Sequence, residues 1–286
     1  MSVPSFTKTF HNSPYPAINI TRPELSMTNK SVVITGGGAG IGLATARAFA
    51  LAGAKNIIIT GRTLGKLQNA KKEIERLSSS TAVHLQVVDM KDQAATNEIF
   101  ASLRNTIGPL EVLVHNASYL SDIAEVVSSD VNDWWEGFEV NVKGTFVITR
   151  AFLHNSIGKG AVIINVSSAV AHFPFLPGYS SYAGSKAAAV RLLDYIAGEN
   201  AGVRVVSCHP GVIDTDMGRK SAEYVKPAAY DDIQLPASFI VWLASTEADF
   251  LKGRFVWSNW DVTELKAREQ EIVEKNLLTL QLAGWP

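Results

Sequence analysis

Tyr182 and Lys186 are four residues apart at the start of a segment with a helical pattern, so we expect their side chains on one helix face. A phenol has an ordinary pKa of about 10, and a neighbouring ammonium lowers that pKa. Tyr182 can then exchange a proton with a substrate oxygen while a hydride moves to or from the adjoining carbon. Because this spacing is common by chance, the pair needs support from other residues.

Two kinds of polar residue provide candidates for that support. Ser168 follows the predicted strand 161–166, where a hydroxyl faces the ligand crevice of an open α/β sheet and can bind the reacting oxygen, although an ordinary turn serine would look the same. Asn141 lies inside the predicted helix 133–156, where asparagine is mildly unfavourable, which indicates another role. Asn116 follows a predicted strand, and either asparagine could be a plain polar residue.

A glycine-rich segment follows the predicted strand 31–35 and runs directly into a helical pattern. Thr35, Gly36, Gly40 and Gly42 fit the spacing T-G-x-x-x-G-x-G. Glycines let the backbone approach an anion, and a helix N-terminus adds free N–H groups and partial positive charge. A turn without a ligand would have the same composition, but the position between strand and helix favours a dinucleotide pyrophosphate site.

The end of the second predicted strand bears on which cofactor binds. An NAD site usually has a carboxylate there for the ribose hydroxyls, whereas this chain has Gly61 and Arg62. Glycine leaves room for a 2′-phosphate and a guanidinium can bind it. The pattern favours NADP(H) over NAD(H), the alternative being that Arg62 is a solvated loop residue.

These residues depend on strands and helices that alternate along the chain. Short apolar runs predict strands at 31–35, 56–60, 82–88, 112–115, 161–166, 203–209 and 254–257. Longer segments predict helices at 41–51, 63–78, 92–106, 133–156, 181–197 and 236–243. The alternation predicts the α/β class, with a single-domain, Rossmann-type, doubly wound parallel sheet of about seven strands and helices on both faces.

Three parts of the chain follow from this pattern. Residues 31–260 are expected to form the dinucleotide-binding catalytic domain. Residues 1–30 are expected to form an N-terminal arm, either packed on the surface or mobile, and residues 261–286 a C-terminal helical tail.

Composition limits the partners. The 286 residues include 26 Lys plus Arg and 27 Asp plus Glu, a formal net charge of -1, so neither a nucleic acid nor a membrane is an expected partner. The single cysteine, Cys208, excludes disulfides, and the six histidines lack the spacing of metal ligands, so no metal site is expected. No secretory signal or membrane-spanning run is recognised, which makes the cytoplasm the expected location.

In their order along the chain, these motifs resemble the short-chain dehydrogenase/reductase family, fungal members included. The resemblance covers roughly residues 31–257 and rests on Thr35-Gly36…Gly40-Ile41-Gly42, Asp89, Asn116-Ala117, Asn141, Ser168, Tyr182…Lys186 and Pro210-Gly211-Val212-Ile213-Asp214-Thr215. The chain departs from the family at His115-Asn116-Ala117-Ser118, where Asn-Asn-Ala-Gly is usual. Its interval from Ser168 to Tyr182 is one residue longer than the commonest, so a neighbouring serine is an alternative to Ser168.

The resemblance implies four catalytic residues. Tyr182 would be the general acid–base, and Lys186 would lower its pKa and hold the nicotinamide ribose. Ser168 would orient the substrate carbonyl, and Asn141 would hold a water in a proton relay.

The resemblance also implies cofactor contacts and an assembly. The cofactor-binding set is Thr35, Gly36, Gly40, Ile41, Gly42, Arg62, Asp89, Asn116, Ala117, Tyr182, Lys186, Pro210, Gly211, Ile213 and Thr215. Within it Asp89 would bind the adenine edge, Asn116 the adenosine side and Thr215 the carboxamide. A homodimer or homotetramer is implied, with Trp134, Trp135 and Phe138 as interface anchors or as core.

The substrate side is expected after the fourth to sixth predicted strands. Its candidate lining is Tyr119, Leu120, His172, Phe173, Phe175, Leu176, Tyr179, Met217 and Tyr224, each of which could instead be a core or subunit contact. An apolar, aromatic lining suits a bulky ketone, such as a polyketide, a terpenoid or an aromatic ketone. Residues 214–232 are a candidate lid.

The function that these residues favour is NADP(H)-dependent interconversion of a ketone and a secondary alcohol. An alternative keeps the cofactor without net redox change, as an epimerase, a dehydratase or a cyclase. A cofactor-binding regulator without turnover is a third hypothesis. The intact set of Ser168, Tyr182 and Lys186 argues against that third one.

Overall fold

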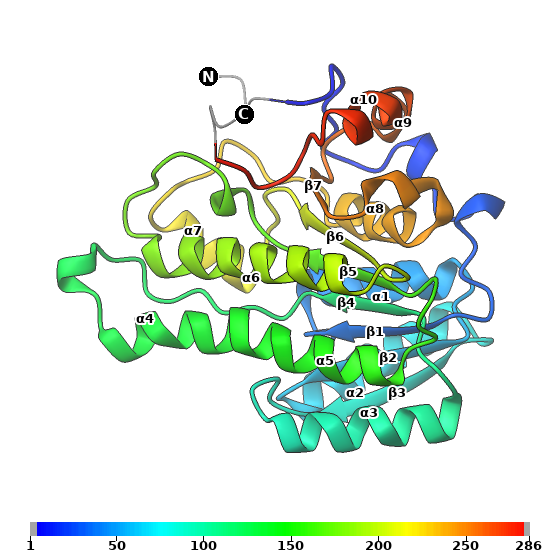
Figure 1. Cartoon of the computed structure of the whole chain (residues 1–286). Helices are drawn as coiled ribbons and strands as arrows, with labels where there is room; N and C mark the ends of the chain where they lie inside the picture. Colours follow the sequence, from blue (N-terminus) through cyan, green and yellow to red (C-terminus); the bar gives the residue numbers. More distant parts are fainter. Residues whose placement is uncertain (1–4, 283–286) are drawn as a thin grey trace.

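The centre of the molecule is one parallel sheet, in a computed structural model that describes residues 5–282. Its seven strands lie in the order β3-β2-β1-β4-β5-β6-β7 (Figure 1). They are β1 (Ser31–Thr35), β2 (Asn56–Gly61), β3 (Ala82–Val87), β4 (Val112–His115), β5 (Val162–Val166), β6 (Arg204–His209) and β7 (Arg254–Trp257). The strand predictions are confirmed, with ends that differ by at most one residue.

Helices cover both faces of the sheet (Figure 1). They are α1 (Gly40–Leu51), α2 (Leu64–Leu77), α3 (Gln93–Ile107), α4 (Val131–Phe138), α5 (Thr145–Asn155), α6 (Ser180–Glu199), α7 (Asp216–Ala222), α8 (Gln234–Ala244), α9 (Val262–Ala267) and α10 (Glu269–Glu274). Because side chains alternate along a strand, Val32 and Ile34 pack into the core beneath α1, α2 and α8, while Val33 packs beneath α3, α5 and α6. The doubly wound fold is confirmed.

The prediction of one continuous helix over residues 133–156 is wrong. The structure has α4, then a π-helical stretch at Glu139–Gly144, then α5. A π-helical turn holds one residue more than an α-helical turn and often marks a functional position. Asn141 lies in this stretch and is buried, with its side chain fully engaged in hydrogen bonds, which explains why the regular helix yields there.

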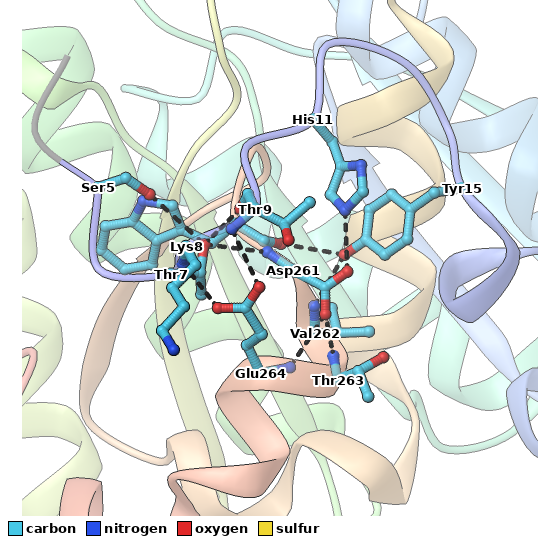
Figure 2. A network of polar contacts seen from close by, with 11 residues as sticks. Ser5, Thr7, Lys8, Thr9, His11, Tyr15, Asp261, Val262, Thr263 and Glu264 are labelled. Atoms are coloured by element: carbon cyan, nitrogen blue, oxygen red, sulfur yellow. Dashed lines mark hydrogen bonds and ion pairs between the residues drawn. The ribbon is translucent and has the colours of Figure 1, made fainter. Parts of the chain in front are cut away.

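Residues 5–30 of the expected N-terminal arm are packed against the rest of the chain, and residues 1–4 lie outside the described residues. It contains two 3₁₀ turns, Pro16–Ile18 and Pro23–Leu25, and both pack on α8. Figure 2 shows its first residues beside the start of α9, where the Glu264 carboxylate accepts hydrogen bonds from the backbone N–H groups of Lys8 and Thr9 (2.6 and 3.0 Å). Next to them His11 Nε2 lies 2.9 Å from the Asp261 carboxylate.

Candidate active site

The predicted site residues gather at the carboxyl edge of the sheet. Thr35 ends β1, Asn116 follows β4, Ser168 follows β5 and Pro210 follows β6. β1 and β4 are neighbours although two strands separate them in sequence, so the connections diverge between them. Ligands of doubly wound folds bind at this point.

The glycine loop has the geometry of an anion site. Gly36 and Gly40 have φ angles of +66° and +53°, a region that disfavours other residues. A Cβ at Gly42 would overlap the Gly36 carbonyl oxygen. α1 begins at Gly40, and Ala39 before it supplies no side-chain cap, so the N–H groups of its first turn can receive a pyrophosphate.

Thr35 and Asn116 hold the two loops together. The Thr35 hydroxyl oxygen accepts from the backbone N–H groups of Asn116 and Ala117, each at 3.0 Å. Asn116 Nδ2 donates to the Thr35 carbonyl oxygen at 3.0 Å. The structure brings these predicted cofactor-binding residues together, and their hydrogen bonds set the spacing between the glycine loop and the segment after β4.

Arg62 and Asp89 follow the ends of β2 and β3. Arg62 is exposed, and within residues 5–282 no hydrogen bond or ion pair of its guanidinium is found. No carboxylate stands between Gly61 and Thr63. Asp89 is partly buried and accepts from the Lys91 backbone N–H at 2.9 Å, which fixes its carboxylate beside the same edge.

Thr215 connects the glycine loop to the segment after β6. Its hydroxyl oxygen caps α7 by accepting from the Gly218 N–H at 3.0 Å, and its methyl carbon is 3.2 Å from the position of a Cβ at Gly40. Between Pro210 and Thr215, Gly211 has a φ of +90° and Ile213 is buried.

Tyr182 and Lys186 lie on one face of α6, as their spacing predicts. Lys186 is 5 % exposed, and its Nζ is 5.6 Å from the centre of the Tyr182 ring and donates to the Val166 carbonyl oxygen at 3.0 Å. Burial raises the pKa of Tyr182 to about 12 and lowers the pKa of Lys186 to about 8. The predicted lowering of the Tyr182 pKa by Lys186 is therefore not seen, and burial has the largest effect on that pKa.

Two serine hydroxyls affect the Tyr182 phenol. Hydrogen bonding to Ser118 and Ser168 lowers its pKa, in part opposing the effect of burial. The phenol hydroxyl also points at Met217 Sδ, 3.6 Å away. Ser118 was not among the predicted site residues, although its departure from the family pattern was a signal that could have found it.

The Asn141 side chain is fully engaged. Its Oδ1 accepts from Ser118 Oγ (2.9 Å) and from the Tyr119 backbone N–H (2.8 Å). Its Nδ2 donates to the Tyr119 carbonyl oxygen (2.9 Å) and to Ser185 Oγ (3.0 Å). The amide therefore fixes the segment after β4 against α6, and these four hydrogen bonds use its donors and acceptors.

Part of the predicted substrate lining surrounds Tyr182. One apolar cluster contains Leu120, Leu176, Tyr179, Tyr182 and Met217, together with the buried Ile123. Leu120 follows β4, Leu176 and Tyr179 precede α6, and Met217 belongs to α7. The Tyr182 phenol on α6 therefore lies among apolar groups.

A hollow of about 430 Å³ lies beside this cluster, between residues 122–134 and the end of α7. Tyr224 and the Asp133 side chain line it. The Tyr119 hydroxyl donates to that carboxylate, and the bond raises the pKa of Tyr119 to about 12. A larger hollow of about 770 Å³ lies between α6 and residues 249–281, away from Tyr182.

His172, Phe173 and Phe175 lie outside the apolar cluster around Tyr182. His172 Nε2 accepts from the Trp257 indole N–H at 3.1 Å, and the Phe173 and Trp257 ring centres are 5.3 Å apart, so both pack at the end of β7. Phe175 is 89 % exposed. The structure thus divides the predicted lining into a group at the phenol and a group at β7.

Two further observations describe what the chain offers elsewhere. Among residues 5–282, no helix combines the length and apolar character needed to cross a membrane. Over the same residues, no group of three or more His, Cys, Asp or Glu side chains is arranged to hold a metal ion.

Comparison with known proteins decides the family. The sequence profile described as short chain dehydrogenase matches residues 30–226. The chain belongs to the short chain dehydrogenase family. Within that family it is 39 % identical to a short chain dehydrogenase/reductase of Claviceps purpurea, over 98 % of this chain and 95 % of the other. It is 34 % identical to a short chain dehydrogenase of Monascus ruber, over 95 % and 94 % of the two chains.

Solved short chain dehydrogenases share the fold. One from Pseudomonas syringae superposes with a TM-score of 0.76 at 26 % identity, covering 83 % of this chain and 97 % of its own. One from Burkholderia cenocepacia, solved in complex with NADP, superposes with a TM-score of 0.74 at 25 % identity, covering 83 % and 99 %. Membership of the family makes this chain an oxidoreductase that binds a nicotinamide cofactor.

Proposed function

We propose that this short chain dehydrogenase uses NADP(H) to interconvert a ketone and a secondary alcohol on a bulky, apolar substrate. The observation that carries the proposal is the position of the Tyr182 ring 5.6 Å from the Lys186 ammonium on one face of α6, with the Ser168 hydroxyl after β5 lowering the pKa of the phenol. This is a proton donor, an oxygen-binding hydroxyl and a fixed positive charge in one place.

The residues divide the work of ketone reduction. When bound, NADPH supplies the hydride. Ser168 donates a hydrogen bond to the substrate carbonyl oxygen, and Tyr182 delivers the proton to that oxygen. The pKa of about 12 keeps Tyr182 protonated at neutral pH, the form that reduction requires. Met217 moves aside, because its sulfur occupies the direction in which the phenol hydroxyl points.

The cofactor assignment rests on three groups. The uncapped first turn of α1 would hold the pyrophosphate, and the exposed Arg62 would bind the 2′-phosphate that distinguishes NADP(H). Asp89 would take the adenine edge and Thr215 the carboxamide. The related enzyme from Burkholderia cenocepacia that was solved with NADP supports the choice.

The substrate assignment rests on the apolar cluster at the phenol. Leu120, Leu176, Tyr179 and Met217 surround Tyr182 with apolar surface, and Tyr179 is buried. A charged substrate would lose its hydration there without gaining a partner, whereas a polyketide, terpenoid or aromatic ketone would gain from burial.

The proposal includes an assembly and a location. Trp135 on α4 is 55 % exposed and Phe146 on α5 is 49 % exposed, and such aromatic surface is typical of subunit contacts, so we infer a homodimer or homotetramer. The single, buried Cys208 is consistent with a reducing compartment, from which we infer the cytoplasm.

The test follows the absorbance of reduced nicotinamide during turnover of a panel of ketones. Tyr182→Phe should reduce hydride transfer by roughly 10²- to 10⁴-fold and leave NADPH affinity nearly unchanged, because only the proton donor is lost. Tyr195→Phe, at an exposed tyrosine on the same helix, is the matched control and should keep the wild-type rate. A Tyr182→Phe enzyme with most of its activity would refute the mechanism. Product formation without net NADPH loss would instead indicate an epimerase, a dehydratase or a cyclase.

A further inference from the structure

The turn after β6 leads to the residue that is proposed to bind the nicotinamide carboxamide. Gly211 in this turn has a φ of +90°, which glycine adopts far more readily than other residues, and Val212 after it is 44 % exposed. Thr215, the residue proposed to bind the carboxamide, lies directly before α7. The position of Thr215 therefore depends on what holds Gly211 and Val212 in place.

The Asp231 side chain and backbone both hold this turn. Asp231 Oδ2 accepts from the Val212 backbone N–H at 2.8 Å, and the Asp231 N–H donates to the Val212 carbonyl oxygen at 2.7 Å. The same Oδ2 occupies the space in which a Cβ at Gly211 would lie. Asp231 also forms an isolated β-bridge with Ile213. One residue near the end of the candidate lid thus meets three successive residues of the turn.

Asp231 is itself held by two asparagines from distant parts of the chain. Asn12 Nδ2, in the arm, donates to Asp231 Oδ1 at 2.5 Å, and Asn259 Nδ2, after β7, donates to Asp231 Oδ2 at 3.1 Å. Asn259 is 1 % exposed, and its Nδ2 also donates to the His11 carbonyl oxygen at 2.9 Å. The Asp232 N–H donates to the Asn12 carbonyl oxygen at 2.8 Å. The arm, the segment after β7 and the end of the candidate lid therefore meet at the turn.

We propose that the N-terminal arm takes part in cofactor binding through Asp231, a positioning residue that Asn12 and Asn259 hold and that fixes residues 211–213 for the nicotinamide half. This inference rests on the proposed role of Thr215 in binding the carboxamide. A turn that is already fixed loses less conformational freedom when the cofactor binds, so the affinity is higher.

The two halves of the cofactor should depend on Asp231 to different extents. The adenosine half is proposed to bind at Arg62 and Asp89, which follow β2 and β3. In the sheet, β1, β4 and β5 lie between β2 and β6, so the turn after β6 is remote from the adenosine half. A general weakening of the fold would affect both halves, whereas a loosened turn affects the nicotinamide half.

The test compares the dissociation constants of NADPH and of adenosine 2′,5′-bisphosphate, which represents the adenosine half alone, by titration calorimetry. Asp231→Ala should weaken NADPH binding by roughly tenfold and leave adenosine 2′,5′-bisphosphate binding unchanged, because the turn loses a hydrogen bond to a charged group. Asn12→Ala, at an exposed residue of the arm, should weaken NADPH binding by about threefold, because it removes one of the bonds that hold the carboxylate.

A conservative variant and two controls complete the design. Asp231→Asn keeps an oxygen acceptor for the Val212 N–H, so it should recover most of the affinity that Asp231→Ala loses. Asp232→Ala, whose side chain accepts from the Gln234 N–H instead, and Ser13→Ala, next to Asn12, should bind both ligands as the wild type does. Unchanged NADPH affinity in Asp231→Ala, or an equal loss for both ligands, overturns the inference.

These binding measurements separate the inference from the proposed function. They need no turnover, so a wild type that reduces no ketone counts against the proposed function alone. A wild type that prefers NADH to NADPH counts against the proposed role of Arg62, and the same comparison is then made with NADH and adenosine 5′-diphosphate.

Discussion

Arg62 shows how one residue type can decide between two cofactors. No carboxylate follows β2 directly, and the exposed Arg62 guanidinium is the group that we propose to bind a 2′-phosphate. Attraction is then local, which is compatible with a formal net charge of -1 for the whole chain. NADH has no 2′-phosphate, so we expect Arg62 to contribute little to the binding of NADH.

Replacing Arg62 with alanine should therefore weaken NADPH binding by roughly 10- to 100-fold, the loss of a charged hydrogen-bonding pair, and leave NADH binding nearly unchanged. Titration of each cofactor by fluorescence measures the two dissociation constants. Arg150→Ala, at an exposed arginine of α5, controls for the loss of one charge. An equal loss of affinity for NADPH and for NADH would show that Arg62 does not bind the 2′-phosphate.

The site residues illustrate what side-chain type and spacing reveal. The four-residue interval correctly predicted that Tyr182 and Lys186 share a helix face. It could not predict the direction of the Tyr182 pKa, because burial depends on Leu120, Tyr179 and Met217, which come from distant segments. Ser118 was not predicted for a similar reason, since its hydrogen-bond partner Asn141 is brought next to it only by folding.

At the scale of elements, α7 lies within the predicted lid and is bonded to the segment after β4. Lys220 Nζ donates to the Leu120 carbonyl oxygen at 3.0 Å and is 2.8 Å from the Asp122 carboxylate. Tyr179 Oη lies 2.7 Å from Ser221 Oγ. With Met217 Sδ 3.6 Å from the Tyr182 hydroxyl, these contacts hold α7 against the candidate site.

Lys220→Ala should loosen α7, because it removes both contacts with the segment after β4. We expect several-fold faster amide exchange over residues 216–222 and a higher KM for ketone, with cofactor affinity preserved. Arg219→Ala is the matched control, since the ion pairs of Arg219 are with Asp214 and Asp216, which lie outside that segment. If amide exchange over residues 216–222 is equally fast in both variants, the Lys220 contacts do not hold α7 in place.

Elements differed in how well they could be predicted. Buried strands such as β4 and β7 were predicted to the residue, because a short apolar run between polar turns has few alternatives. The π-helical stretch at Asn141 was not, because its cause is a set of hydrogen bonds to Ser118, Tyr119 and Ser185 that periodicity does not encode. α7 was missed as a helix because only seven mostly polar residues form it.

At the scale of the whole molecule, two buried histidines couple folding to pH. Burial lowers the pKa of both His115 and His209 to about 3. The His115 Nε2 is 2.7 Å from Thr149 Oγ1, and His209 Nδ1 accepts from the Ala169 N–H at 3.1 Å, so both rings are held neutral in the core. Below the ordinary histidine pKa of about 6.5, the unfolded chain takes up protons that the folded chain cannot.

Stability should therefore fall as the pH drops below about 6.5, and each histidine should contribute about 2 kcal/mol to the loss between pH 7 and pH 5. Urea unfolding at several pH values measures how the free energy of unfolding depends on pH. His115→Asn, the residue usual at this position in the family, should remove about 2 kcal/mol of that dependence, whereas His154→Asn at an exposed site of α5 should not. An unchanged slope in His115→Asn would contradict the assignment.

The packing of the arm has a consequence for how the protein is made. Lys8 and His11 are synthesised 256 and 250 residues before their partners, Glu264 and Asp261 (Figure 2). Ile18 of the arm likewise becomes buried only after α8, on which its turn packs, has been synthesised. During synthesis the arm therefore stays undocked until residues 261–264 have left the ribosome, and side chains such as Ile18 are accessible until then.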